Sequence, residues 1–290
     1  MPYVTSAGAK IYWEEADVLP PPPTGSQRES EVGSAVFADS AVKQPLLLIM
    51  GLGATLEWWQ RLIPILAPRY RTVVFDNRGV GRSDVPPGPY SIPQMAEDAV
   101  AVMDAAKLAT AHVFGASMGG MIAQELALNH PRRVQSLILG CTACGGRQAV
   151  PASKEVAAAL GARATMTRED AMWLMAPYTF DASTPRERVA EDLAVRLAAT
   201  VPNDGYFAQL QAIRAWSGTY DRLAGMAVPT LVIHGETDRL VPVENGRILA
   251  GAIPGARLAL IPHASHIFFT DQLEASSEAI LAFLAAPASA

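Results

Sequence analysis

Residues 111–121 read AHVFGASMGGM, a short apolar run followed by a serine with a glycine two positions away on either side. The pattern predicts a buried strand over 111–114, a tight turn, and a helix that begins at Met118. Gly115 and Gly119 let the backbone of this turn pass close to itself. The serine would then project beside a helix N-terminus, where free N–H groups favour a developing anion. The segment therefore predicts Ser117 as a nucleophile.

The composition is typical of one large α/β domain with a sizeable core, since half of the 290 residues are hydrophobic and the net charge is −5. No stripe rich in lysine and arginine indicates a nucleic-acid partner. No apolar stretch approaches the roughly 20 residues of a membrane helix, and no secretory signal is visible. We therefore expect a cytoplasmic protein with no membrane partner; the sequence indicates no oligomeric state.

The order of apolar runs predicts a mostly parallel sheet with helices on both faces, because strands alternate with helices along the chain. The expected strands include 46–50, 71–75, 134–139, 230–233 and 257–261. Between the strands at 134–139 and 230–233 the pattern is helical and rich in methionine and aromatic residues. We expect a core formed by 1–145 and 226–290, and a helical cap over 146–225 inserted before the last two strands. The proline-rich segment 18–40 is expected to be a surface insertion within the core.

The residues that would activate Ser117 follow two later strands. Asp238 follows the strand at 230–233, and His266 follows the last strand. The carboxyl ends of parallel strands share one edge of the sheet, so Ser117, Asp238 and His266 are expected to meet there. A serine needs a base, and the base needs an acid that holds its tautomer. His263 and Glu236 are the weaker alternatives for the base and the acid.

Two backbone N–H groups are expected to stabilise the oxyanion that such a reaction forms. Met118 supplies one, directly after the nucleophile. Leu52 supplies the other, because the glycines on both sides of it let the loop after the strand at 46–50 turn its N–H inward. No phosphate-binding or metal-ligand pattern is complete, so we expect neither a metal nor a cofactor. Cys141 and Cys144 are expected to be structural or incidental.

Four features in this order resemble the α/β-hydrolase superfamily, of the type that bears a cap. They are Gly51-Leu52-Gly53, the segment DNRGVGRS at 76–83, the turn at Ser117, and Asp238 with His266. The second resembles the family's D-x-R-G-x-G-x-S loop, which is structural there and supports the oxyanion region. The resemblance extends from about Pro45 to the C-terminus. One departure is Met50-Gly51, where many relatives have His-Gly; the oxyanion donor is a backbone group, so this change affects the pocket wall more than the mechanism.

The resemblance implies a serine hydrolase that cleaves an ester or lactone through an acyl-enzyme. An apolar pocket for a small-to-medium hydrophobic substrate is expected from Trp58, Trp59, Met172, Trp173, Trp216 and Ile267. Related families use the same three residues for carbon–carbon bond hydrolysis and for cofactor-free perhydrolysis, recorded as haloperoxidase activity. Some relatives are ligand receptors that keep the triad. These alternatives stay open at the level of sequence.

Overall fold

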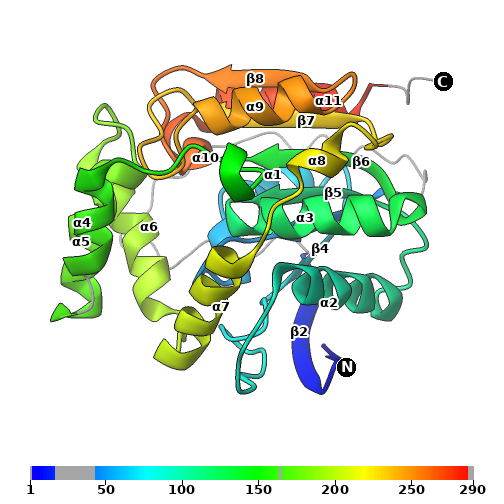
Figure 1. Ribbon diagram of the computed structural model, residues 1–290, viewed down its shortest axis with the longest axis horizontal. Helices are drawn as coiled ribbons and strands as arrows, with labels where there is room; N and C mark the ends of the chain where they lie inside the picture. Colours follow the sequence, from blue (N-terminus) through cyan, green and yellow to red (C-terminus); the bar gives the residue numbers. More distant parts are fainter. Residues whose placement is uncertain (1, 17–42, 163–164, 287–290) are drawn as a thin grey trace, which may run out of the picture.

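The computed structural model describes residues 2–16, 43–162 and 165–286. The proline-rich segment 18–40 lies outside the described residues. An eight-stranded sheet runs through the molecule in the order β1-β2-β4-β3-β5-β6-β7-β8 (Figure 1). The strands are β1 (Tyr3–Ser6), β2 (Ala9–Glu15), β3 (Pro45–Ile49), β4 (Arg71–Phe75), β5 (Ala111–Ala116), β6 (Val134–Gly140), β7 (Thr230–Gly235) and β8 (Arg257–Ile261).

The sheet is parallel from β4 to β8, and β1 and β2 add an antiparallel hairpin at one edge. This arrangement confirms the mostly parallel sheet predicted from the order of apolar runs. The central strands are buried along nearly their whole length, as continuous apolar runs require. No helix within the described residues is long and apolar enough to cross a membrane.

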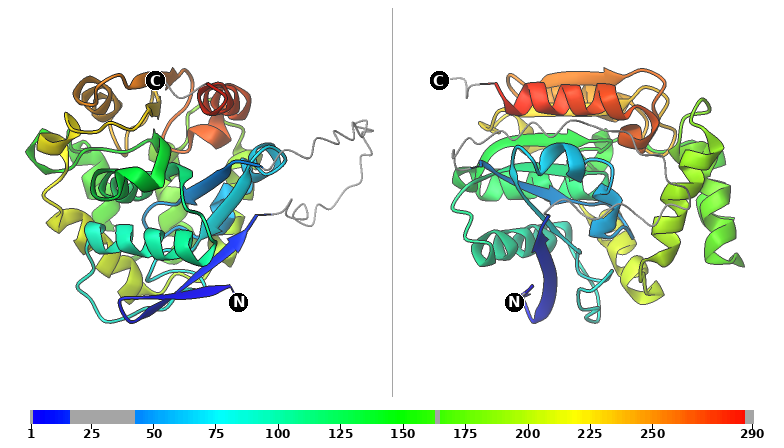
Figure 2. Two further views of the ribbon diagram at one scale, coloured as in Figure 1. Left: turned by 90° about the vertical axis from the view of Figure 1, so that its right-hand side faces the viewer. Right: turned by 180° about the vertical axis from the view of Figure 1, so that it is seen from behind.

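Helices cover both faces of the sheet (Figure 2). Alternate strand residues belong to two separate apolar clusters. One face carries α2 (Ile92–Ala105), α3 (Met118–Asn129) and α9 (Glu244–Ala252). The other carries η1 (Leu56–Trp59), α1 (Ile63–Leu66), α10 (Phe268–Asp271) and α11 (Leu273–Leu284).

Helix α2 shows how local sequence sets an element's ends. It begins after Ser91, whose side chain accepts a hydrogen bond from Gln94 N at 3.2 Å, as expected of an N-cap. The sequence predicts that the helix reaches residue 108, but it ends at Ala105. Lys107 has φ 58°, a left-handed conformation that cannot continue a right-handed helix.

The four longest helices that the structure describes between β6 and β7 are called the β6–β7 helices below. They are α4 (Lys154–Ala162), α5 (Arg168–Thr179), α6 (Arg186–Ala198) and α7 (Asn203–Ala215). A short helix, α8 (Tyr220–Leu223), then leads to β7. Figures 1 and 2 show α4, α5 and α6 together at one end of the sheet, beside α10.

Candidate active site

Ser117 occupies the sharp turn between β5 and α3. Its backbone has φ 56° and ψ −122°. This conformation is energetically unfavourable for any residue that has a side chain. Ser117 N donates to Gly140 O at 2.9 Å, and Thr142 Oγ1 donates to Ser117 O at 2.7 Å. A Cβ at Gly119 would overlap the carbonyl group of Ile49, so the turn needs glycine there. The strained serine is thus held by neighbouring strands on both sides.

His266 and Asp238 form a buried pair at the same edge of the sheet. Each is 5% exposed, and His266 Nδ1 lies 2.8 Å from Asp238 Oδ2, so the ring donates to the carboxylate. Asp238 Oδ1 accepts from the N–H groups of Leu240 and Val241 at 2.9 and 2.8 Å. These bonds leave the carboxylate little freedom to turn. The pair has the geometry by which an acid orients a catalytic imidazole.

His234, at the end of β7, is a further partner of Asp238. Its Nε2 lies 3.3 Å from Asp238 Oδ2 and 2.8 Å from Val241 O. Burial acts to raise the pKa of Asp238, but the facing charge of His266 and hydrogen bonds from His234 and His266 lower it. Asp238 is therefore ionised when the pair is intact.

The alternative base and acid, and two further histidines, lie elsewhere. His263 and Glu236 are both exposed, each three residues or fewer from the buried pair in sequence but outside it. His112 Nδ1 contacts Ser136 Oγ at 2.8 Å, and His130 Nε2 pairs with Glu97 at 2.8 Å on the surface. None of these side chains has a hydrogen bond to Ser117, Asp238 or His266 within the described part of the chain.

Cys141, expected to be structural or incidental, also reaches this edge. Cys141 directly follows β6 and is 1% exposed. Burial on its own lowers the pKa of His266, but interactions with Cys141 and Asp238 outweigh it and raise the pKa well above its usual value. Cys144 packs in the cluster on the opposite face of the sheet, and both thiols are free. The sequence signal was the position of Cys141 directly after a buried strand.

The loop after β3 lies directly against Ser117. A Cβ at Gly51 would come within 2.9 Å of Ser117 Cβ, so Leu52 follows a residue in contact with the serine. Gly53 N donates to Gln209 Oε1 at 2.9 Å, and Gln209 Nε2 donates to Arg78 O at 2.7 Å. Gln209 on α7 therefore fixes the loop from the side of the β6–β7 helices, a contact that sequence patterns do not reveal.

The DNRGVGRS segment at 76–83 forms hydrogen bonds with residues on both sides of the loop that contains Leu52. Asp76 is fully buried and accepts from Leu56 N and Arg82 N, both at 2.9 Å. Asn77 Nδ2 donates to Met50 O at 2.9 Å. Met118, the other expected oxyanion donor, is the first residue of α3, where backbone N–H groups have no partner within the helix. The loop and the helix thus bring Leu52 and Met118 to either side of Ser117.

The residues expected to line a pocket separate into four groups. Trp58 and Ile267 line a narrow cavity of about 10 Å³ between η1, α6 and α10, together with Gln60, Asp192, Val195 and Phe269. Met172 and Trp173 are half-buried and pack against the apolar cluster that also contains Trp59 and Phe269. Trp59 is fully buried against Phe114 and Phe269, as a core residue. Trp216 belongs to the cluster on the opposite face, and its Nε1 donates to Glu125 Oε1 at 2.8 Å.

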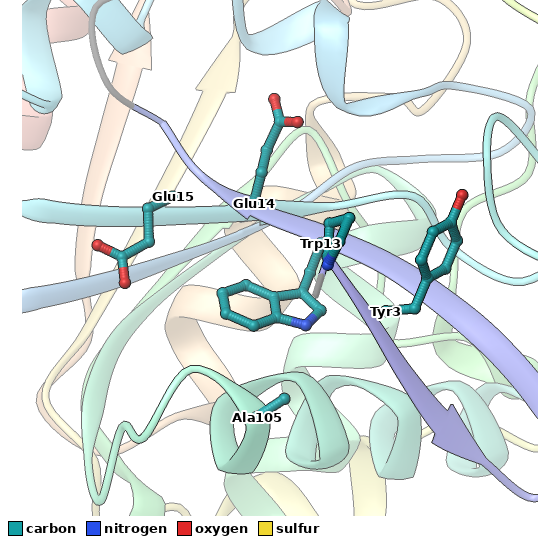
Figure 3. Close-up of a pocket in the computed structure, with 6 residues that line it drawn as sticks. Tyr3, Trp13, Glu14, Glu15 and Ala105 are labelled. Carbon is teal, nitrogen blue, oxygen red and sulfur yellow. The ribbon is translucent and has the colours of Figure 1, made fainter.

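A larger hollow of about 580 Å³ lies away from these residues, at the antiparallel edge of the sheet. Figure 3 shows Tyr3, Trp13, Glu14 and Glu15 of β1 and β2 around it, with Ala105 of α2 below. It is open to solvent and shares no lining residue with Ser117, Asp238 or His266. The strand ends that carry Ser117, Asp238 and His266 are therefore separate from this surface hollow.

Comparison with known proteins gives consistent matches. The family model of the α/β hydrolase fold matches residues 44–273. A protein of Azorhizobium caulinodans, provisionally named a carbamate hydrolase, is 33% identical over 82% of this chain and 90% of its own length. The poly(3-hydroxyalkanoate) depolymerase of Ectopseudomonas oleovorans is 32% identical over 83% and 84%.

Solved structures agree with the sequence matches. The enol-lactonase from Burkholderia xenovorans LB400 has a TM-score of 0.80 with this structure at 26% identity, covering 98% of this chain and 100% of that one. The family model spans more than two thirds of the sequence. The chain belongs to the α/β-hydrolase fold family.

Proposed function

We propose that the protein is a serine hydrolase that cleaves a carboxylic ester or lactone through an acyl-enzyme. The observation that carries the proposal is the placement of a strained serine and a buried histidine–aspartate pair at one sheet edge. Ser117 is the nucleophile, His266 is the general base, and Asp238 orients the imidazole. Leu52 and Met118 donate their N–H groups to the oxyanion.

The reaction has two halves that use the same groups. His266 accepts the Oγ proton of Ser117 as Oγ attacks the substrate carbonyl, and the resulting oxyanion binds the two N–H groups. The tetrahedral intermediate collapses, and His266 gives its proton to the leaving alkoxide. Water then passes a proton to His266 and attacks the acyl carbon. His266 returns the proton to Ser117 Oγ, and the acid product leaves.

The expected substrate is small to medium in size and hydrophobic. The side chains around the narrow cavity beside His266 are mostly apolar, with Trp58, Val195, Ile267 and Phe269 on its walls. A volume of about 10 Å³ holds no more than a single water molecule. We therefore propose that the β6–β7 helices form a cap and that substrate is admitted when α6 moves away from η1. The names of relatives that act on lactones and polyesters support an acyl substrate.

The test is a panel of p-nitrophenyl esters of increasing acyl length, lactones and aryl carbamates, assayed with wild type and Ser117→Ala. We expect hydrolysis of esters or lactones, a preference for short to medium acyl chains, and a loss of at least about a thousandfold in kcat for the variant. Circular dichroism should show that the variant is folded. Full activity in Ser117→Ala would rule out the assignment.

Two parts of this substrate panel distinguish the proposed function from its alternatives. Preferred cleavage of carbamates would move the substrate class toward that of the Azorhizobium relative. Peroxide in the assay would detect perhydrolysis as peracid formation. Inertness toward every ester, lactone and carbamate would contradict the proposed reaction and favour carbon–carbon bond hydrolysis or ligand binding.

A further inference from the structure

Asp271 is a buried carboxylate close to the proposed base, and the mechanism above gives it no part. It is the last residue of α10 and is 5% exposed. A carboxylate removed from water is costly unless hydrogen-bond donors surround it. One donor is the backbone N–H of Ser265, which lies 2.7 Å from Asp271 Oδ2 and directly precedes His266. On the other side of His266, Ile267 N donates to Thr179 O at 2.9 Å. The backbone is therefore held on both sides of the imidazole.

Two further donors to Asp271 come from the connection between α5 and α6, residues 180–185, which is called the α5–α6 connection below. Asp181 N donates to Asp271 Oδ2 at 3.1 Å. Thr184 Oγ1 donates to Asp271 Oδ1 at 2.6 Å. Both carboxylate oxygens thus accept hydrogen bonds. One side chain therefore joins the segment of the base to the α5–α6 connection.

The α5–α6 connection also reaches the loop of the proposed acid. Thr237, which directly precedes Asp238, donates from Oγ1 to Asp181 Oδ2 at 2.6 Å. Thr237 N donates to Ala264 O at 2.9 Å, so the loop of the acid also contacts the loop of the base. Asp181 therefore holds the residue before the acid with its side chain, and its N–H group binds Asp271.

These bonds matter because the strand ladder ends before the acid and the base. The last paired residues of β7 and β8 are Gly235 and Ile261, and both Asp238 and His266 lie in the loops that follow. Groups that act together in catalysis must be held within about 0.5 Å of their productive geometry. The bonds of Asp271 and Asp181 supply such support from outside the strands.

We propose that Asp271 is a positioning residue for His266: its carboxylate fixes the backbone before the base to the α5–α6 connection, whose Asp181 holds the loop of the acid. The inference rests on the proposed function, because it takes His266 as the base and Asp238 as the acid. Asp271 transfers no proton and touches no substrate in this account. It keeps His266 Nδ1 and Asp238 Oδ2 at the hydrogen-bond distance of 2.8 Å.

The experiment compares Asp271→Leu with Asp271→Asn, two side chains of similar size to the carboxylate. Asparagine keeps an oxygen for the N–H groups of Ser265 and Asp181, and its NH₂ group can donate to Thr184 Oγ1. Leucine accepts no hydrogen bond and leaves those N–H groups unpaired. The two variants therefore separate the hydrogen bonds from the volume of the side chain.

A milder pair of variants keeps Asp271 itself. Thr184→Val removes the donor to Asp271 Oδ1 at a half-buried position and keeps the shape of the side chain. Thr200→Val is the matched control at an exposed position after α6. The readouts are kcat and KM on the best ester, and the low-field proton NMR signal of the Nδ1–H group of His266. The second readout needs no turnover, and circular dichroism checks that each variant is folded.

In Asp271→Leu, kcat should fall by about 10- to 100-fold with little change in KM, because a displacement of about 1 Å can cost about 10²-fold in rate. The low-field signal should weaken or disappear in the same variant. Asp271→Asn should stay within about threefold of wild type in kcat and keep the signal, since its hydrogen bonds are retained. Thr184→Val should lie between these two variants, and Thr200→Val should match wild type.

The inference would be overturned by folded Asp271→Leu with the kcat and the low-field signal of wild type. A fall in Asp271→Asn as large as that in Asp271→Leu would overturn it too, because the hydrogen bonds would then not position the base. If Asp271→Leu does not fold, Thr184→Val decides, and values equal to those of Thr200→Val would contradict the inference. If wild type hydrolyses no ester or lactone, the proposed function fails, while the NMR signal still decides whether Asp271 positions His266.

Discussion

The carboxyl edge of the sheet and the β6–β7 helices are held in place in different ways. At the edge, backbone bonds between strands fix the candidate residues: Ser117 N is bonded to Gly140 O and Cys141 N to Ile233 O. The β6–β7 helices are held by side chains that come from distant parts of the sequence. Asp192 on α6 pairs with Arg61 at 2.7 Å and accepts from Thr270 Oγ1. The edge is thus built by the sheet, and the helices are attached to it.

The contacts that attach the β6–β7 helices also hold two segments next to the candidate residues. Gln209 on α7 holds the loop that contains Leu52. Ile267 N, next to His266, donates to Thr179 O at the end of α5 at 2.9 Å. Any movement of the β6–β7 helices would therefore act on the loop of Leu52 and on the segment that contains His266. We expect changes at the edge to remove the chemistry, and changes in the helices to weaken it.

Asp238→Asn is the strongest test of the edge. The amide keeps the shape of the carboxylate and one acceptor for the N–H groups of Leu240 and Val241. Its NH₂ group would face His266 Nδ1 and favour the wrong tautomer, so kcat should fall by about 10⁴-fold with little change in KM. Steady-state kinetics on the best ester measure this. A loss of less than tenfold would show that Asp238 does not orient the base.

Gly205→Ala tests the attachment of α7. A Cβ at Gly205 would overlap the backbone of Gly79, so α7 must shift and take Gln209 with it. We expect a loss of about 1–3 kcal/mol in the free energy of unfolding, and a fall in kcat of about tenfold. Urea unfolding and ester kinetics measure the two effects.

Gly161→Ala on α4 is the matched control for that substitution. Nothing lies within 4 Å of a Cβ at this position, so alanine should be neutral or stabilise the helix by up to about 1 kcal/mol. Equal stability of the two variants would show that the contact between Gly205 and Gly79 does not hold α7 in place.

A smaller effect on stability is expected at Asp271, which joins the residues between α5 and α6 to the loop after β8. Asp271 accepts from Thr184 Oγ1 at 2.6 Å and from the N–H groups of Ser265 and Asp181 at 2.7 and 3.1 Å. Burial raises the pKa of this carboxyl to about 6, against the effect of those hydrogen bonds. Between its unfolded pKa of about 4 and its folded pKa, the folded state binds more protons than the unfolded state. The contribution of Asp271 to stability therefore falls as the pH rises through this window.

Wild type should lose about 1 kcal/mol more stability than Asp271→Asn on going from about pH 5 to about pH 7. Asp221→Asn, at an exposed position, should show the pH dependence of wild type. Urea midpoints at the two pH values measure the difference. Identical slopes for wild type and Asp271→Asn would show that Asp271 does not titrate in this window.

The difference between the sheet edge and the β6–β7 helices also explains what the sequence could predict. Strand periodicity and the rule that parallel strands end at one edge were enough for the fold and for the joint placement of Asp238 and His266. The rule also applies to Cys141, but its spacing from Cys144 has no supporting metal-ligand or redox pattern, so the sequence predicts only a structural or incidental role. Trp216 appears in an apolar helical stretch, and nothing in its neighbours indicates the bond to Glu125 that places it on the other face. Side-chain contacts such as those of Gln209 join residues more than 100 positions apart, which no local pattern encodes.

Covalent labelling with a fluorophosphonate tests the central claim most directly, because the reagent reacts with a serine that an adjacent base has activated. We predict one equivalent of label on the peptide that contains Ser117, at a rate greatly reduced in Asp238→Asn and absent in Ser117→Ala. The Cys144→Ser variant should be labelled at the wild-type rate. Label on another residue, or labelling of Ser117→Ala at the wild-type rate, would contradict the assignment of Ser117 as the nucleophile.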